Sequence, residues 1–141
     1  MTAAEHPPQT LRFLAQGLLG FESVLDYELS AYDQETPFYW LRASSDPDLA
    51  FLVMEPGLLL DDYAFDLSDE DAQALDIQSP EEILVLVILT IPEDPLQMSA
   101  NLLGPLVFNR RTHLGRQLIL DAQRYPLRFP VLPAEDEAPA C

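Results

Sequence analysis

Turn-forming residues divide this chain into many short apolar runs, and this spacing limits what the chain can fold into. The sequence contains 13 proline residues, and proline is excluded from helix interiors and from central strands. The runs between the turns are rich in aromatic and β-branched residues, which favour strands. We therefore expect an all-β fold, a small antiparallel β-barrel-like single domain with one or two short helices.

The expected strands are the apolar runs themselves: residues 11–14, 27–32, 38–41, 51–54, 63–67, 83–91, 106–108, 117–120 and 127–132. The run at residues 83–91 does not alternate between apolar and polar residues, so it should be buried on both faces. Glycines at positions 17, 20, 104 and 115, together with the prolines, are expected to lie in the turns between strands.

Two short helices fit between the strands. Ser68 and Asp71 have the spacing of a capping box, which predicts a helix over residues 69–75 with Ala72 and Leu75 facing inward. Ser79 followed by Pro80 could start a single helical turn before the long apolar run. Residues 97–103 are expected to form an irregular loop that carries Asn101, because prolines flank them.

The folded unit should cover residues 11–132 of the 141-residue chain, which is an ordinary length for one domain. Residues 1–10 and 133–141 combine proline, alanine and charge, so we expect a disordered N-terminus and a disordered acidic C-terminal tail. No apolar run approaches the ~20 residues of a membrane span. The first residues do not have the pattern of a secretory signal, and the expected location is cytoplasmic.

The charge balance constrains the partners. The chain has 24 acidic and 7 basic residues, for a net charge of −17. Such a surface repels nucleic acid and anionic lipid and favours a basic protein partner. It also opposes self-association, so a monomer is expected when the protein is free. A salt-adapted or high-GC proteome is the alternative explanation of this composition.

Five of the arginines lie close together near the C-terminal end of the folded unit: Arg110, Arg111, Arg116, Arg124 and Arg128. Pairing with the abundant carboxylates is the first interpretation of this group. Contact with a phosphate or carboxylate of a ligand is the second.

No catalytic, cofactor or metal site is expected. Cys141 is the only cysteine and His6 and His113 have no metal-ligand spacing, so the common zinc sites cannot be assembled. The acid pairs Asp61-Asp62 and Glu81-Glu82 are adjacent in sequence, whereas a glycosidase needs two carboxyl groups that converge from separate elements. A hydrolase on an all-β scaffold is therefore a disfavoured alternative.

Several segments occur in the order found in one known family. They are residues 17–21, 37–41, 50–56, 101–109 and 116–120, and the motif at 101–109 reads Asn-Leu-Leu-Gly-Pro-Leu-Val-Phe-Asn. Over residues 11–129 the chain resembles the FliW family of bacterial flagellar assembly factors. Two departures from the family pattern, Arg42 and Gly104, put fine partner specificity in doubt rather than the fold.

The resemblance implies a non-enzymatic cytoplasmic protein. It would bind the translational repressor CsrA, relieving repression of flagellin translation, and alternatively the C-terminal region of flagellin. The rival hypothesis is an acidic nucleic-acid mimic that inhibits another RNA- or DNA-binding protein, although a mimic should spread its charge along one continuous helix or strand.

Two groups of residues are candidates for the site. Five acids around the expected strand at 63–67 should form one exposed acidic edge for a basic partner: Asp61, Asp62, Asp69, Glu70 and Asp71. Four residues of the family motif are expected to act mainly through structure, with ligand contact as the minority alternative for the asparagines: Asn101, Pro105, Asn109 and Gln117.

Overall fold

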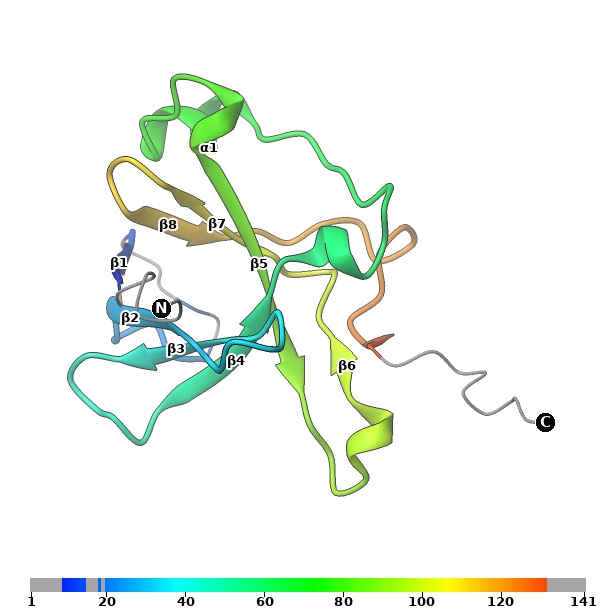
Figure 1. Cartoon of the computed structure of the whole chain (residues 1–141). Coiled ribbons are helices and arrows are strands. Elements are labelled where there is room, and N and C mark those ends of the chain that lie inside the picture. Colours follow the sequence, from blue (N-terminus) through cyan, green and yellow to red (C-terminus); the bar gives the residue numbers. More distant parts are fainter. Residues whose placement is uncertain (1–8, 15–17, 19, 132–141) are drawn as a thin grey trace.

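Seven strands close a β-barrel in the computed structural model, which describes residues 9–14, 18 and 20–131 (Figure 1). They are β1 (Gln9–Phe13), β2 (Asp26–Ala31), β3 (Tyr39–Ala43), β4 (Ala50–Met54), β5 (Ile83–Thr90), β7 (Leu106–Asn109) and β8 (Leu114–Gln117). Their order is β4-β3-β2-β1-β8-β7-β5, and β5 pairs back with β4 to close the barrel. The expected all-β barrel is confirmed.

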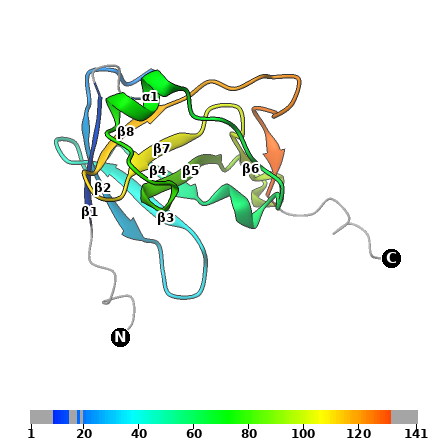
Figure 2. The ribbon, with the colours of Figure 1, turned by 90° about the horizontal axis from the view of Figure 1, so that it is seen from above.

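Almost every strand pairing is antiparallel. The exception is β1 with β8, which run parallel and bring Phe13 beside Gly115. Two short strands, β6 (Ser99–Ala100) and β9 (Phe129–Pro130), continue the sheet beyond β5. In Figure 2, α1 lies beside β8 at one end of the molecule, and β6 with β9 lies at the other.

Alternate residues of β5 enter two different hydrophobic clusters. Leu84 and Leu86 belong to the barrel core, which fills the interior, whereas Val87 and Leu89 belong to an outer cluster on the outside of the barrel. Both faces of this strand are therefore covered, as its continuous apolar sequence predicted. The buried members of the outer cluster are Leu52, Met54, Val87, Leu89, Ala100, Leu102 and Tyr125.

The expected strand at residues 63–67 is wrong. These residues run outside the barrel without pairing to a described strand, because the barrel is already closed and offers them no free edge. The expected strand at 117–120 is also misplaced, since β8 ends at Gln117 and the chain then leaves the sheet. The strand expected at residues 127–132 is too long, because only Phe129–Pro130 form a strand there, β9.

Gly115 lies inside β8 rather than in a turn. A Cβ atom at this position would stand 2.1 Å from Cδ1 of Phe108 on the neighbouring strand. Glycine is needed here because the Phe108 ring occupies the space of a side chain, a reason that the sequence pattern does not reveal.

The helical segments are short, as expected. Helix α1 (Asp69–Ala74) begins after Ser68, whose hydroxyl accepts the backbone N–H of Asp71. The described part of the chain also contains the 3-10 turns η2 (Pro56–Leu58), η3 (Pro80–Glu82) and η4 (Pro95–Gln97). The loop expected at residues 97–103 is partly wrong, because it includes the last residue of η4 and all of β6.

The folded unit also begins earlier in the chain than expected. Strand β1 starts at Gln9, so two residues assigned to the disordered N-terminus belong to the barrel. The remaining expectations for the two ends, and the turn expected at Gly17, lie outside the described residues.

Candidate protein-interaction site

The strap, residues 59–68, connects η2 with α1 across the outside of the barrel (Figure 1). Its central side chains alternate: Tyr63, Phe65 and Leu67 are half-buried, whereas Ala64 and Asp66 are exposed. This is the burial pattern of a strand with one face on the protein. The pattern that predicted a strand therefore identifies the inward face correctly and fails only on the backbone pairing.

Two tyrosine hydroxyls hold the strap. The hydroxyl of Tyr63 donates to the carbonyl oxygen of Leu102 at 2.7 Å. The hydroxyl of Tyr125 donates to the carbonyl oxygen of Ala64 at 2.7 Å and accepts the Ala64 N–H at 3.2 Å. Burial, followed by the electrostatic effect of the nearby Tyr125 hydroxyl, raises the pKa of Tyr63, so this hydroxyl keeps its proton and remains a donor.

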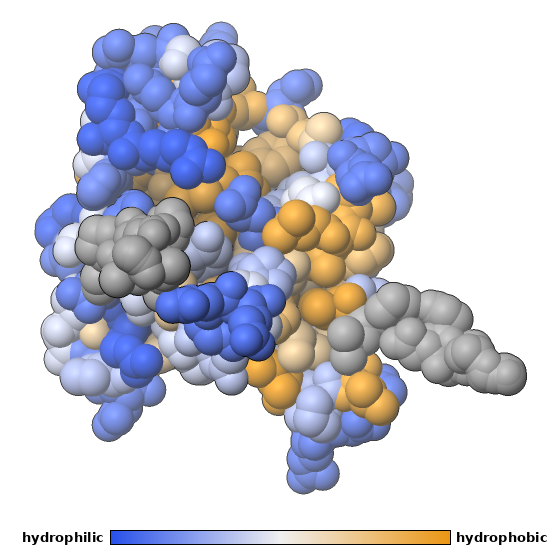
Figure 3. Space-filling view, in the orientation of Figure 1, coloured by the Kyte–Doolittle hydropathy of each residue, from blue (hydrophilic) through white to orange (hydrophobic). Residues whose placement is uncertain are grey.

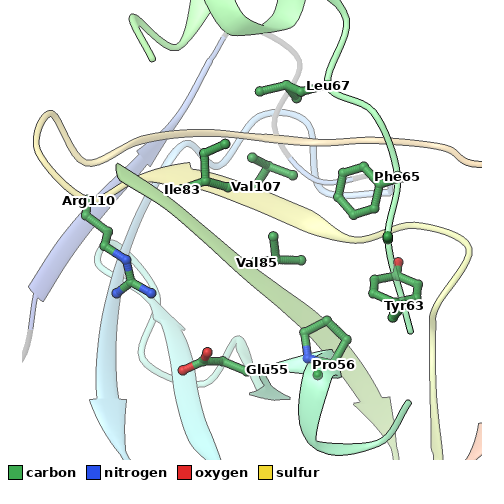
Figure 4. Close-up of a pocket in the computed structure, with 11 residues that line it drawn as sticks. Glu55, Pro56, Tyr63, Phe65, Leu67, Ile83, Val85, Val107 and Arg110 are labelled. Carbon is green, nitrogen blue, oxygen red and sulfur yellow. The ribbon is translucent and has the colours of Figure 1, made fainter. Parts of the chain in front are cut away.

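A cavity of about 330 Å³ lies between the strap and the outer face of β5 and β7. In Figure 4, Phe65 and Leu67 project from the strap toward Ile83 and Val107 on the strands. Arg110 and Glu55 are exposed and lie on the side of the cavity opposite the strap. Their side chains point toward one another. Figure 3 shows the corresponding hydrophobic hollow beneath the hydrophilic lobe that contains α1.

The five candidate acids do not form one edge. Asp61 and Asp62 lie near the η2 end of the strap, and Asp69, Glu70 and Asp71 lie in α1 at the other end. Four of them are exposed. Asp71 is instead engaged within the protein, because it pairs with Arg116 of β8 at 2.5 Å and accepts the Ser68 hydroxyl at 3.0 Å.

Asn109 ties the end of α1 to the barrel. Its side chain is fully buried. Its Nδ2 donates to the carbonyl oxygens of Leu75 at 2.7 Å and Asp76 at 3.0 Å, while its Oδ1 accepts the N–H of Arg111 and of Thr112. All of the partners are backbone groups, so the side chain joins the hairpin between β7 and β8 to the outer layer.

Neither a metal cluster nor a membrane helix is found in the part of the chain that the structure describes. There, no group of three or more His, Cys, Asp and Glu side chains is placed to hold a metal ion. No described helix is long and apolar enough to cross a membrane.

Comparison with known proteins decides the family. The model of the family described as FliW protein matches residues 2–131 of this chain. The chain belongs to the FliW family.

Individual FliW proteins are similar over most of their length. The flagellar assembly factor FliW of Caldicellulosiruptor saccharolyticus is 39% identical over 121 residues, which cover 86% of this chain and 79% of that protein. The one from Leptospira biflexa is 35% identical over 130 residues, covering 92% and 84%. A crystal structure of the flagellar assembly factor FliW matches with a TM-score of 0.79 and 32% identity, covering 88% of this chain and 86% of that one.

The FliW motif residues meet at the start and end of the β7–β8 hairpin. The Oδ1 of Asn101 accepts the Gly104 N–H at 2.8 Å, and Nε2 of Gln117 donates to the Gly104 carbonyl oxygen at 3.0 Å. The carbonyl oxygen of Pro105 accepts the Leu118 N–H at 2.9 Å. These bonds hold the turn that leads into β7.

The arginine group of this FliW chain serves mixed roles. Arg111 pairs with Glu82 at 2.9 Å and with Asp76 at 3.1 Å, and Arg116 pairs with Asp71. Arg124 lies over the ring of Tyr125. The side chains of the other two, Arg110 and Arg128, form no ion pair with a described residue.

Proposed function

We propose that this protein is a non-enzymatic flagellar assembly factor of the cytoplasm that binds CsrA, and alternatively binds the C-terminal region of flagellin. By holding CsrA it relieves the repression of flagellin translation. The family membership, carried by relatives named as flagellar assembly factors, supports the general role. The choice of partners is the expectation that came with the resemblance.

The exposed acids around the strap are the observation that carries the CsrA proposal. Asp61, Asp62, Asp69 and Glu70 are exposed and make no ion pair with a described residue. CsrA recognises RNA through basic residues, so these acids at the two ends of the strap attract it by long-range charge. The net charge of −17 adds to the same attraction.

Exposed apolar side chains in and near η2, β5 and η4 suit the flagellin region. Leu58, Ile91 and Leu96 are 65%, 50% and 68% exposed. A helix with an apolar face binds such a surface through buried side chains rather than through charge. The two partners should therefore differ in their dependence on salt.

Titration calorimetry with purified CsrA, and separately with the flagellin C-terminal region, tests the proposal. A complex at micromolar protein concentration is expected for each partner. Association with CsrA should slow as salt is raised while the complex persists at moderate salt, because screening weakens steering but not a buried apolar contact. Absence of heat of binding with CsrA, confirmed by gel filtration, would overturn the proposal.

A further inference from the structure

The strap has the form of a strand but lacks a partner strand. Its residues 63–67 have alternating burial and follow an extended path between η2 and α1 (Figure 1). Phe65, Asp66 and Leu67 make no hydrogen bond to any residue that the structure describes, through either backbone or side chain. Three successive residues with free backbone groups are a template for pairing with another chain.

The free edge can be assigned to particular residues. In an extended chain the N–H and C=O of one residue point to the same side, and successive residues alternate. Both backbone groups of Ala64 bond to the Tyr125 hydroxyl, so this side of the strap faces Tyr125. The N–H and C=O groups of Phe65 and Leu67 must then point to the opposite side.

The other sheet edges are unsuited to such pairing. Each of the seven barrel strands has a neighbour on both sides, although β1 pairs with β8 only at Arg12 and Phe13, and β4 with β5 only at Val53 and Met54. Strand β9 ends the sheet, but Pro130 has no N–H to donate and so blunts that edge. The strap differs from these edges because three successive residues, Phe65, Asp66 and Leu67, make no hydrogen bond to a described residue.

The groove beside the strap accepts side chains. Its cavity of about 330 Å³ has Ile83, Val85 and Val107 as its apolar floor. A segment lying next to the strap would place every second side chain over this floor and the others toward solvent. Arg110 and Glu55 on the far rim carry opposite charges, so the excess of negative charge lies on the strap side.

The charge of the strap selects the occupant. Residues 61–70 contain Asp61, Asp62, Asp66, Asp69 and Glu70 and no basic residue, and all five acids are exposed. We infer that the strap is an unpaired acidic strand that takes up an extended, basic segment of CsrA by β-augmentation. This inference rests on the proposed function, because CsrA is its basic partner.

Amide hydrogen exchange followed by NMR tests the pairing residue by residue. In the free protein the amides of Phe65 and Leu67 should exchange rapidly, since no described group accepts them. In the complex with CsrA they should slow by roughly tenfold or more, whereas the Asp66 amide, on the Tyr125 side, should stay within about twofold of its free rate. Equal protection of all three amides would indicate simple covering of the strap and would overturn the inference.

A charge variant tests the choice of occupant independently. Asp66→Asn should slow association with CsrA roughly two- to fivefold at low salt, while Asp48→Asn, an exposed acid in the loop before β4, makes the same charge change away from the strap and should leave the rate unchanged. Equal rates for the two variants would overturn the assignment of a basic segment.

The outcomes separate this inference from the proposed function. A CsrA complex that forms without alternating protection of Phe65, Asp66 and Leu67 overturns the strand pairing and leaves the proposed function standing. Failure of CsrA to bind the unmodified protein overturns both.

Discussion

The barrel and the outer layer are held together by different kinds of contact. In the barrel, seven strands are joined on both sides by backbone hydrogen bonds around a closed core. The outer layer, which comprises the strap and α1, is fastened to the rest mainly by side chains. Tyr63, from the strap, and Tyr125, from outside it, hold the strap in place. Asn109 of β7 bonds to the end of α1, and Arg116 of β8 pairs with Asp71.

The difference shows where a partner can act. A closed barrel has no free edge and its core does not reach the surface, so it serves as a rigid platform. Removal of a single side-chain contact can loosen the outer layer without opening the barrel. Segments of low local stability are those that rearrange on binding, and the acidic residues and the free backbone edge both lie in this layer.

The largest effect should come from the barrel core. Phe108 is fully buried and packs against Phe13 with ring centroids 5.2 Å apart. Phe108→Ala should lower the free energy of unfolding by about 3–5 kcal/mol. Phe65→Ala makes the same change in the half-buried strap and should cost roughly 1–2 kcal/mol. Urea denaturation measures both, and equal losses would show that the two regions are equally well packed.

Asn109 joins the two regions, so its loss should be nearly as severe. Asn109→Ala leaves the carbonyl groups of Leu75 and Asp76 and the N–H groups of Arg111 and Thr112 without this partner. A loss of about 2–3 kcal/mol in unfolding free energy is expected. A variant of unchanged stability that no longer binds partners would instead make Asn109 a contact residue.

Tyr125→Phe loosens the strap while keeping the aromatic ring. It removes both bonds to Ala64 and should reduce stability by about 1 kcal/mol. Hydrogen exchange of the Ala64 amide should accelerate, whereas amides of β5 and β7 should exchange as before. Faster exchange throughout the barrel would contradict a separately fastened outer layer.

The smallest effect is a pH-dependent one at Glu82. The Gln78 N–H and then Arg111 hold the pKa of the Glu82 carboxyl below its usual value. Because the folded carboxylate binds its proton more weakly than the unfolded one, its contribution is present at neutral pH and is lost as the pH falls through the lowered pKa. Glu82→Gln should therefore melt earlier at pH 7, and the difference should shrink below about pH 4, as thermal melts at several pH values would show.

The barrel was predicted well because strands and turns are encoded by residues that are neighbours in the sequence. Short apolar runs separated by prolines became strands, and the continuous run that forms most of β5 is covered on both faces. The Ser68 cap was also visible in the sequence, because a capping box needs only neighbouring residues.

The outer layer was harder to predict because its contacts are distant in sequence. Tyr125 lies 61 residues from Ala64 and Arg116 lies 45 residues from Asp71. No local sequence pattern predicts either bond. The strand expected at residues 63–67 was wrong for the same reason, since alternation sets the inward face but cannot say whether a neighbouring strand is present. The acids at the two ends of the strap were expected to form one edge. The sequence pattern does not show how far apart the intervening residues 63–67 hold them.

The central claim is that CsrA binds at the outer layer through its acids, and stopped-flow association at low salt tests it most directly. The triple variant Asp61→Asn, Asp62→Asn and Glu70→Gln removes three exposed acids beside the strap and keeps Asp71 and the Ser68 cap. Its control, Glu28→Gln, Glu35→Gln and Asp48→Asn, removes three exposed acids in and around β2 and β3.

Both variants change the net charge equally, and neither should alter the melting temperature appreciably. The strap variant should associate with CsrA roughly three- to tenfold more slowly than the unmodified protein, with the control nearer to the unmodified rate. Flagellin binding, through an apolar surface, should be unaffected by either. Equal slowing by the two triple variants would show that only total charge matters and would contradict the claim that the outer layer is the CsrA site.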